Sequence, residues 1–305
     1  MIRRKIEVFM LSVGFLFVTG LCHAGIDSLI VPYTATEDVV YGQKEGMALT
    51  FDVLQPEKNR NGLGIILVSS GSWKSGKSNL PEKVAERRRD HWGMGLLHHG
   101  FTVFVVRHGS GPRFHVPEMV EDIRRSVRYI RLNAAEYAVT PDFIGITSGS
   151  SGGHLALMVG ATGDDGEAKS ADPVERVSSR TQAIVSWFPP TDLINWGKPD
   201  GYKVIEKVRP GMFEEMFGTV TDLTDQLKSI SPIYFVTTDD PPLLLIHGDK
   251  DLTVPLQQSE VLQVKYEEVG LPVKLIVQPG GGHTYWDGIE KQYVDVANWF
   301  KRYLK

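Results

Sequence analysis

Short runs of apolar residues alternate with longer amphipathic segments along most of the chain. Short, wholly apolar runs are typical of strands buried on both faces of a sheet, and apolar positions three and four residues apart are typical of helices packed on one. The predicted strands are 64–68, 101–106, 143–147, 183–188, 243–247 and 273–278, and the predicted helices are about 118–137, 155–160, 256–268 and 289–304. This alternation predicts an α/β fold with a mostly parallel central sheet and helices on both faces.

Two segments interrupt the alternation. Residues 25–54 are expected to form an N-terminal extension with antiparallel strands, and residues 192–234 are expected to form a small cap insertion over the site. No linker-like change in composition and no internal repeat divides the chain. We therefore expect residues 25–305 to form a single domain.

The first 24 residues have the three parts of an export signal. Residues 3–5 are basic, residues 8–21 form an uncharged, mostly apolar run of 14 residues, and residues 22–24 resemble a signal-peptidase site. The apolar run is short for a bilayer span, so an uncleaved membrane anchor is the less favoured alternative. We expect a signal peptide cleaved near Ala24 and a secreted or periplasmic mature protein.

Composition and charge narrow the function classes. The 305 residues are 42% hydrophobic and 23% charged, as in ordinary folded domains. Without residues 1–24 there are 30 basic and 36 acidic residues, a formal net charge of −6, and no basic stripe suggests a nucleic-acid partner. Cys22 is the only cysteine, so the mature chain would have no disulfide, cysteine nucleophile or thiolate metal site.

The strongest chemical signal is the Gly-Ser-Ser-Gly-Gly run at 149–153. It lies between the predicted strand 143–147 and a helix expected to start near His154, which is the context of the G-x-S-x-G nucleophile elbow. Ser151 is the serine with glycine two residues away on both sides, so we predict Ser151 as the nucleophile. The backbone N–H of Gly152 would then face a developing oxyanion. A glycine-rich turn without chemistry is the alternative.

A serine nucleophile needs a histidine base, which follows it in the chain order of this fold. His154 lies too close along the following helix to fold back to the serine. His247 closes a strand and is expected to be a packed, hydrogen-bonded histidine. His283 follows strand 273–278 and a glycine-rich stretch, at the sheet edge where such sites lie, so His283 is the predicted base.

The acid is expected after strand 243–247. Asp249 lies in the tight turn and is expected to cap it, whereas Asp251 lies further out, before Val254, and can reach a histidine on a neighbouring loop. We predict Asp251 as the acid, with Asp192 after strand 183–188 as the reserve candidate.

Residues 71–78 match the phosphate-binding pattern G-x-x-x-x-G-K-[ST] in full. Pro81 disfavours a helix running on from Lys77, and no later strand ends in a convincing magnesium-binding aspartate. We therefore predict no nucleotide site. The competing prediction is that the backbone N–H groups of Gly71 and Ser72 form the second half of an oxyanion hole.

From about residue 47 onward the chain resembles bacterial α/β-hydrolase carboxylesterases of the group that includes feruloyl and acetylxylan esterases, which is related to the catalytic domain of prolyl oligopeptidases. The resemblance is carried by the elbow at 146–156, by the acid segment from Ser231-Pro232 and Pro241-Pro242 to 247–255, and by Gly282-His283. One departure is the oxyanion loop, where Ser69-Ser70-Gly71-Ser72-Trp73 stands in place of the usual His-Gly-Gly-Gly-Trp.

Together these features predict a secreted serine esterase that needs no metal or organic cofactor. The predicted partner is a small-molecule or carbohydrate ester substrate, and membrane contact is expected only through an uncleaved signal segment. A serine peptidase or amidase with the same triad, and a non-catalytic binding protein on a hydrolase scaffold, are the alternatives.

Overall fold

The protein is described by a computed structural model that covers residues 29, 31–76, 92–203, 207, 210–217, 223–284 and 286–305. The predicted signal segment, residues 1–24, lies outside the described residues. So do Lys77, Ser78 and Pro81 of the phosphate-loop pattern.

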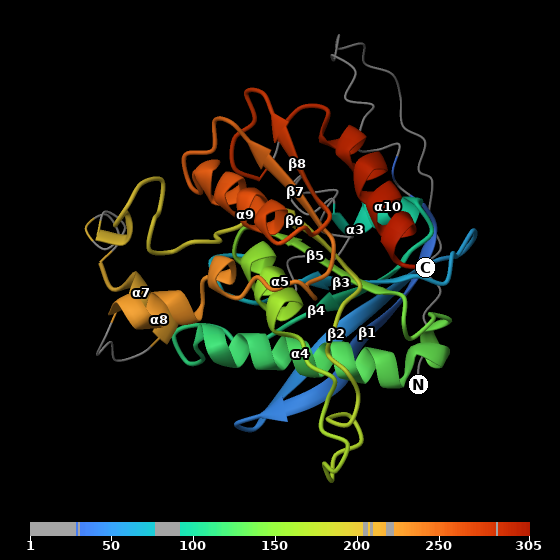
Figure 1. Ribbon diagram of the computed structural model, residues 1–305. Coiled ribbons are helices and arrows are strands. Elements are labelled where there is room, and N and C mark those ends of the chain that lie inside the picture. The colour runs from blue at the N-terminus through green and yellow to red at the C-terminus, as the bar shows by residue number, and fades with distance from the viewer. Residues whose placement is uncertain are drawn as a thin grey trace, which may run out of the picture.

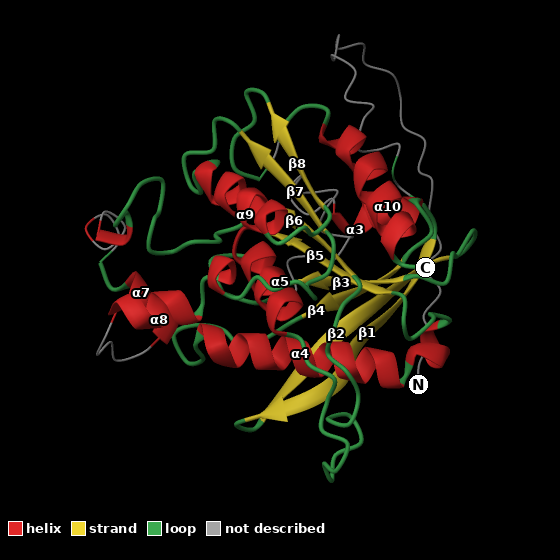
Figure 2. Cartoon of the chain, in the orientation of Figure 1, coloured by secondary structure: helices red, strands yellow, loops and turns green. Residues whose placement is uncertain are grey.

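The centre of the molecule is one eight-stranded sheet with the order β1-β2-β4-β3-β5-β6-β7-β8 (Figures 1 and 2). β1 pairs antiparallel with β2 and β2 antiparallel with β4, and every other neighbouring pair is parallel. The strands are β1 (Tyr33–Lys44), β2 (Met47–Pro56), β3 (Gly64–Val68), β4 (Thr102–Val106), β5 (Ile144–Gly149), β6 (Ala183–Trp187), β7 (Leu243–Gly248) and β8 (Val273–Gln278). The predicted mostly parallel sheet is confirmed, with the antiparallel strands at its N-terminal edge.

Helices cover both faces of the sheet (Figure 1). They are α3 (Trp92–His98), α4 (Val116–Leu132), α5 (Ser150–Thr162), α7 (Met212–Phe217), α8 (Leu223–Ser229), α9 (Gln257–Glu268) and α10 (Gln292–Tyr303), with short 3₁₀ turns at Ala134–Tyr137, Pro232–Tyr234 and Ile289–Lys291. α4, α5 and α9 pack into one apolar cluster, and α3 and α10 pack into the cluster on the opposite face.

The two clusters follow from the alternation of side chains along each strand. In β3, Ile66 and Val68 belong to the cluster under α4 and α5, while Ile65 and Leu67 belong to the cluster under α3 and α10. Successive side chains of a strand point to opposite faces, so a strand covered on both sides must be apolar throughout. This is the pattern from which the sequence predicted buried strands.

The described structure differs from the sequence prediction at one junction that decides the site. β5 runs on to Gly149, and α5 begins at Ser150 rather than near His154. Strand and helix therefore meet without a loop between them. The turn of the elbow lies one residue earlier than the spacing of the glycines indicates.

Residues 192–234, the predicted cap insertion, carry α7, α8 and the 3₁₀ turn Pro232–Tyr234. α7 contributes the buried side chains of Phe213 and Met216 to the cluster that also contains α4. In Figure 1 this part of the chain lies beyond the end of α4, to one side of the sheet. No helix among the described residues is both long and apolar enough to cross a membrane.

Candidate active site

Ser150 stands at the sharp turn between β5 and α5. Its backbone φ is 53°, in the left-handed region that a non-glycine residue rarely adopts. Such strain persists where the surrounding structure fixes it, and it is the backbone feature of the nucleophile elbow.

Close packing behind the turn explains the glycine that follows. A Cβ on Gly152 would stand 2.2 Å from the Ser148 Oγ and 3.0 Å from the Ser70 Cβ. The Ser148 hydroxyl is itself committed, because it donates to the Val68 carbonyl at 2.6 Å. Helix α5 thus approaches β3 and β5 closely only because residue 152 lacks a side chain.

His283 joins the turn to the acid. Its Nε2 lies 3.0 Å from the Ser150 Oγ, and its Nδ1 lies 2.7 Å from Asp251 Oδ2. A carboxylate only accepts, so Nδ1 carries the proton and Nε2 is free to accept the Ser150 hydroxyl proton. The structure therefore brings His283 and Asp251 together, as the sequence predicted, and adds Ser150 in line with them.

The prediction of Ser151 as the partner of His283 is wrong. Ser151 lies in the first turn of α5, is 2% exposed, and its Oγ accepts the backbone N–H of Gly71 at 3.2 Å. The G-x-S-x-G pattern favoured the wrong serine. Ser151 has a glycine two residues before it and two residues after it, whereas Ser150 has Ser148 in place of the first glycine. The signal that identifies Ser150 is the length of the strand, since the elbow serine follows directly on its last residue.

Asp251 is held by several donors at once. Its Oδ1 accepts the backbone N–H groups of Thr253 and Val254 at 2.8 and 2.9 Å, and its Oδ2 faces His283 and, at 3.4 Å, Nε2 of His247. Burial alone would raise the pKa of Asp251, but the hydrogen bonds from His247, His283 and Val254 outweigh burial and hold that pKa well below its usual range. The carboxylate is therefore ionised at any working pH.

The second histidine beside Asp251 is structural. The Nδ1 of His247 lies 2.7 Å from the Ser259 Oγ, and its Nε2 lies 2.9 Å from the Val254 carbonyl. Both ring nitrogens are thus used inside the protein, which confirms the expected packed and hydrogen-bonded histidine. Its contact with Asp251 was not anticipated from the sequence.

The other two carboxylates do not reach His283. Asp249 accepts the backbone N–H of Gly280 at 2.7 Å, so it ties its turn to the loop that leads to His283 rather than capping its own backbone. Asp192 accepts the N–H groups of Ile194 and Asn195 at 3.1 and 3.0 Å and orders its own loop. Of the three candidates, only Asp251 contacts the imidazole.

Of the three predicted oxyanion residues, only Gly71 directs its backbone N–H into the site. The N–H of Gly71 points into the site, toward the Ser151 Oγ. The N–H of Gly152 is directed away from it, because it donates to the Ser70 Oγ at 3.3 Å. Ser72 is exposed, with φ of 55°, and among the described residues its N–H makes no contact with the site. The prediction for Gly152 is therefore wrong, since with Ser150 at the turn the following N–H belongs to Ser151.

The loop that carries Gly71 is anchored by a buried histidine. Trp73 Nε1 donates to His154 Nδ1 at 3.1 Å, and His154 Nε2 donates to the Ile230 carbonyl at 2.6 Å. Burial lowers the pKa of His154 to about 4, with the Ile230 carbonyl opposing the shift, so the ring is neutral near pH 7. As expected, His154 does not reach the elbow serine.

An aromatic ring supports the imidazole from the side. The ring centroids of Phe188 and His283 are 4.6 Å apart, and Phe188 is fully buried. Its φ of 39° turns the chain sharply after β6. Sequence reasoning missed Phe188 because nothing in an apolar residue at a strand end marks it as a neighbour of the base.

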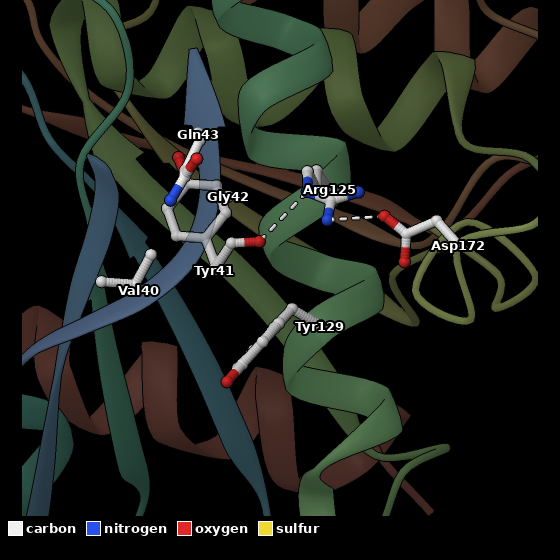
Figure 3. A pocket seen from close by; sticks show the side chains of 7 residues that line it. All are labelled: Val40, Tyr41, Gly42, Gln43, Arg125, Tyr129 and Asp172. Carbon is white, nitrogen blue, oxygen red and sulfur yellow. Dashed lines mark hydrogen bonds and ion pairs between the residues drawn. The ribbon is translucent and has the colours of Figure 1, made fainter. Parts of the chain in front are cut away.

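A surface hollow of about 610 Å³ lies away from these residues, between β1 and α4 (Figure 3). Arg125 lies in it, donates to the Tyr41 carbonyl at 3.1 Å and pairs with Asp172 at 2.7 Å and with Glu175. The charge of the guanidinium is thus balanced within the protein. The described residues contain no cluster of three or more side chains suited to a metal ion.

A mostly parallel sheet with a hydrogen-bonded serine, histidine and aspartate at the carboxyl ends of its strands defines an α/β-hydrolase. The comparisons with known proteins agree. The chain belongs to the BD-FAE family, whose sequence profile matches residues 51–266.

The chain is similar to the esterase LipQ of Mycobacterium tuberculosis, with 26% identity over 227 residues that cover 73% of this chain and 50% of LipQ. It is also similar to the carboxylic ester hydrolase LipM, described as probable, of the same organism, with 27% identity over 74% of this chain and 50% of LipM. The chain thus spans about half the length of these curated relatives. Among solved structures, a truncated carbohydrate esterase from gut microbiota shares 29% identity and a TM-score of 0.72, over 89% of this chain and 96% of that one.

Proposed function

We propose that the protein is a serine esterase that hydrolyses carboxylic esters through Ser150, His283 and Asp251. One observation carries the proposal: the line of hydrogen bonds from Asp251 through His283 to Ser150, with Ser150 in the strained turn between β5 and α5. A serine at its ordinary pKa is a poor nucleophile, and this line supplies both the base and the group that orients the base.

In the first half of the reaction the Ser150 Oγ attacks the ester carbonyl carbon while its proton moves to His283 Nε2. The Asp251 carboxylate stabilises the resulting imidazolium. The tetrahedral intermediate then expels the alcohol, which takes the proton from His283, and an acyl group remains on Ser150. In the second half water attacks the acyl carbon, His283 again serves as base, and the acid is released.

The negative charge of the tetrahedral oxygen would be held by two backbone N–H groups. In this fold they come from the residue after the nucleophile and from the loop after the first parallel strand, here Ser151 and Gly71. Losing one such donor typically lowers turnover by about 10²–10³-fold. Of the three oxyanion residues that we expected with a nucleophile at 151, which were Gly71, Ser72 and Gly152, this proposal keeps only Gly71.

The substrate class that we propose is an acylated carbohydrate or another small ester. The support is the similarity at 29% identity to a carbohydrate esterase, together with the esterase names of the curated relatives. We also propose that residues 1–24 direct export and are removed, which would bring the enzyme to ester substrates outside the cytoplasm.

The test is a hydrolysis panel of short-chain aryl esters, acetylated xylo-oligosaccharides, methyl ferulate and aminoacyl anilides, with Ser150→Ala as the blank. We expect turnover of esters that the variant lacks, and little or none of the anilides. Faster cleavage of anilides than of esters would point to the peptidase alternative, and equal rates for wild type and variant would refute the proposal.

A further inference from the structure

The hydroxyl of Ser70 bridges the two sides of the elbow. Its Oγ lies 2.7 Å from the Gly149 carbonyl, just before Ser150, and 3.3 Å from the N–H of Gly152, just after the turn. It also lies 3.3 Å from the Ser151 Oγ. Ser70 directly precedes Gly71, the loop residue whose N–H points into the site.

The direction of these hydrogen bonds can be worked out from the groups involved. A carbonyl only accepts, so the single proton of the Ser70 hydroxyl goes to Gly149. The Ser151 hydroxyl must then donate to Ser70, and it accepts the N–H of Gly71 at 3.2 Å. A series of hydrogen bonds with one direction therefore runs from the Gly71 N–H through the Ser151 and Ser70 hydroxyls to the Gly149 carbonyl.

This series of hydrogen bonds joins two segments with strained backbone, the loop after β3 and the elbow at Ser150. Ser72 and Trp73 have φ of 55° and 58°, and Ser150 has φ of 53°, which are values that non-glycine residues rarely adopt. Strained backbone keeps its geometry only where several contacts fix it. The pair of hydroxyls sets the distance between the Gly71 N–H and the elbow, independently of the Trp73–His154 contact further along the loop.

Resting on the proposed esterase function, we propose that Ser70 and Ser151 are positioning residues, a hydroxyl clamp that holds the Gly71 N–H where the oxyanion forms. In the free protein the Ser151 Oγ accepts this N–H. When the oxyanion forms, the N–H turns to it, and Ser151 keeps its hydrogen bond to Ser70. The clamp should affect kcat rather than substrate binding, because the negative charge that the Gly71 N–H stabilises is absent from the bound ester and develops only toward the transition state.

The test compares Ser70→Ala with Ser75→Ala, a serine of the same loop whose Oγ accepts the His108 N–H at 3.1 Å instead of a group of the elbow. We expect Ser70→Ala to lower kcat about tenfold or more, with KM within about twofold, since the clamp positions the Gly71 N–H, whose interaction with the oxyanion is made only in the transition state. Ser70→Thr, which keeps the hydroxyl, should restore most of kcat. Ser75→Ala and Ser70→Ala should lower the melting temperature by similar amounts, since each loses one hydroxyl, but kcat of Ser75→Ala should stay within about twofold of wild type.

Ser151→Ala supplies the second arm. Because the two hydroxyls act as one clamp, the double variant Ser70→Ala/Ser151→Ala should be no slower than the slower of the two single variants, within about twofold. Unchanged kcat in Ser70→Ala, equal loss of kcat in Ser75→Ala, or fully additive losses would overturn the clamp while the wild type remains an esterase. A faster Ser151→Ala would also overturn it, since Ser151 would then compete for the Gly71 N–H. A wild type without ester hydrolysis would refute the proposed function, and the clamp with it.

Discussion

Asp251 is the residue on which most of the site's hydrogen bonds converge. Two backbone N–H groups and two histidines surround its carboxylate, and the hydrogen bonds from His247, His283 and Val254 keep its pKa well below the usual range despite burial. A carboxylate held in this way fixes the tautomer of His283 and, in the proposed mechanism, stabilises the positive charge that forms on the ring.

Asp251→Asn should therefore lower kcat by about 10³–10⁴-fold, because an amide in this place favours the wrong imidazole tautomer. Asp249→Asn keeps an oxygen that can accept the Gly280 N–H and loses only the negative charge, so we expect a stability loss of no more than about 1 kcal/mol and turnover within a few-fold of wild type. Steady-state kinetics and urea unfolding of both variants check this. Inactivity confined to Asp249→Asn or to Asp192→Asn would move the acid away from Asp251.

At this scale the sequence predicted His283 and Asp251 but missed the serine by one position. Histidine and aspartate were found from their places after particular strands, which the parallel topology determines. The choice between Ser150 and Ser151 depends on where β5 ends, and a strand end is set by tertiary hydrogen bonds that the residue pattern does not show. One such hydrogen bond runs from the Ser148 hydroxyl, behind the turn, to the Val68 carbonyl.

Helix α5 links the elbow to the loop of Gly71. His154, one turn after Ser150, accepts a hydrogen bond from the Trp73 indole and donates one to Ile230, beyond α8. One neutral ring thus holds three segments together, and it can do so only while it stays unprotonated.

This dependence predicts a loss of stability in acid. The pKa of His154 falls from 6.5 to about 4 on folding. Between these two pH values the imidazole is therefore protonated in the unfolded chain but stays neutral in the folded protein. The free energy of unfolding should fall by roughly 3 kcal/mol between pH 6.5 and 4 from this group, and level off below. Urea unfolding at several pH values should show a shallower fall of this free energy with acid in His154→Gln than in the wild type. Parallel curves for wild type and His154→Gln would contradict this.

The loop after β3 also bears on the phosphate-binding pattern at 71–78. The Gly71 N–H is directed at the Ser151 hydroxyl, toward the elbow. We expect Lys77→Ala to keep ester hydrolysis within a few-fold of wild type, and ATP with magnesium to leave the melting temperature unchanged, since a ligand of the native state must raise it. An ATP-dependent rise that Lys77→Ala removes would establish a nucleotide site instead.

At the scale of whole elements, the apolar runs predicted the parallel strands to within two residues at each end, because both faces of those strands are covered. The first helix of the described structure after β3, α3, was not predicted. Its seven residues, Trp92–His98, are too few to show a period.

In the whole molecule, the parallel topology brings the site together. β3, β5, β7 and β8 end at Val68, Gly149, Gly248 and Gln278, and their following segments carry Gly71, Ser150, Asp251 and His283. Parallel strands end at the same edge of a sheet, so residues far apart in sequence meet there. This is why the site could be predicted approximately from the order of motifs alone.

The proposed export signal predicts which form of the protein a cell produces. If residues 1–24 are removed, the mature chain begins at Gly25, and its intact mass and N-terminal sequence in a cell envelope or culture-medium fraction should show this. An Ala24→Arg variant should remain uncut, because the cleavage site needs a small residue. Recovery of the wild type with residues 1–24 attached would support the uncleaved anchor instead.

The identity of the nucleophile is tested most directly by mapping the site of covalent labelling. A fluorophosphonate should modify one serine of the wild type, and peptide mass spectrometry with fragmentation should place the adduct on Ser150. Ser150→Ala should lose both labelling and ester hydrolysis with its fold intact, while Ser151→Ala should still be labelled at Ser150 and keep measurable turnover. An adduct on Ser151, or a labelled and active Ser150→Ala, would contradict the assignment.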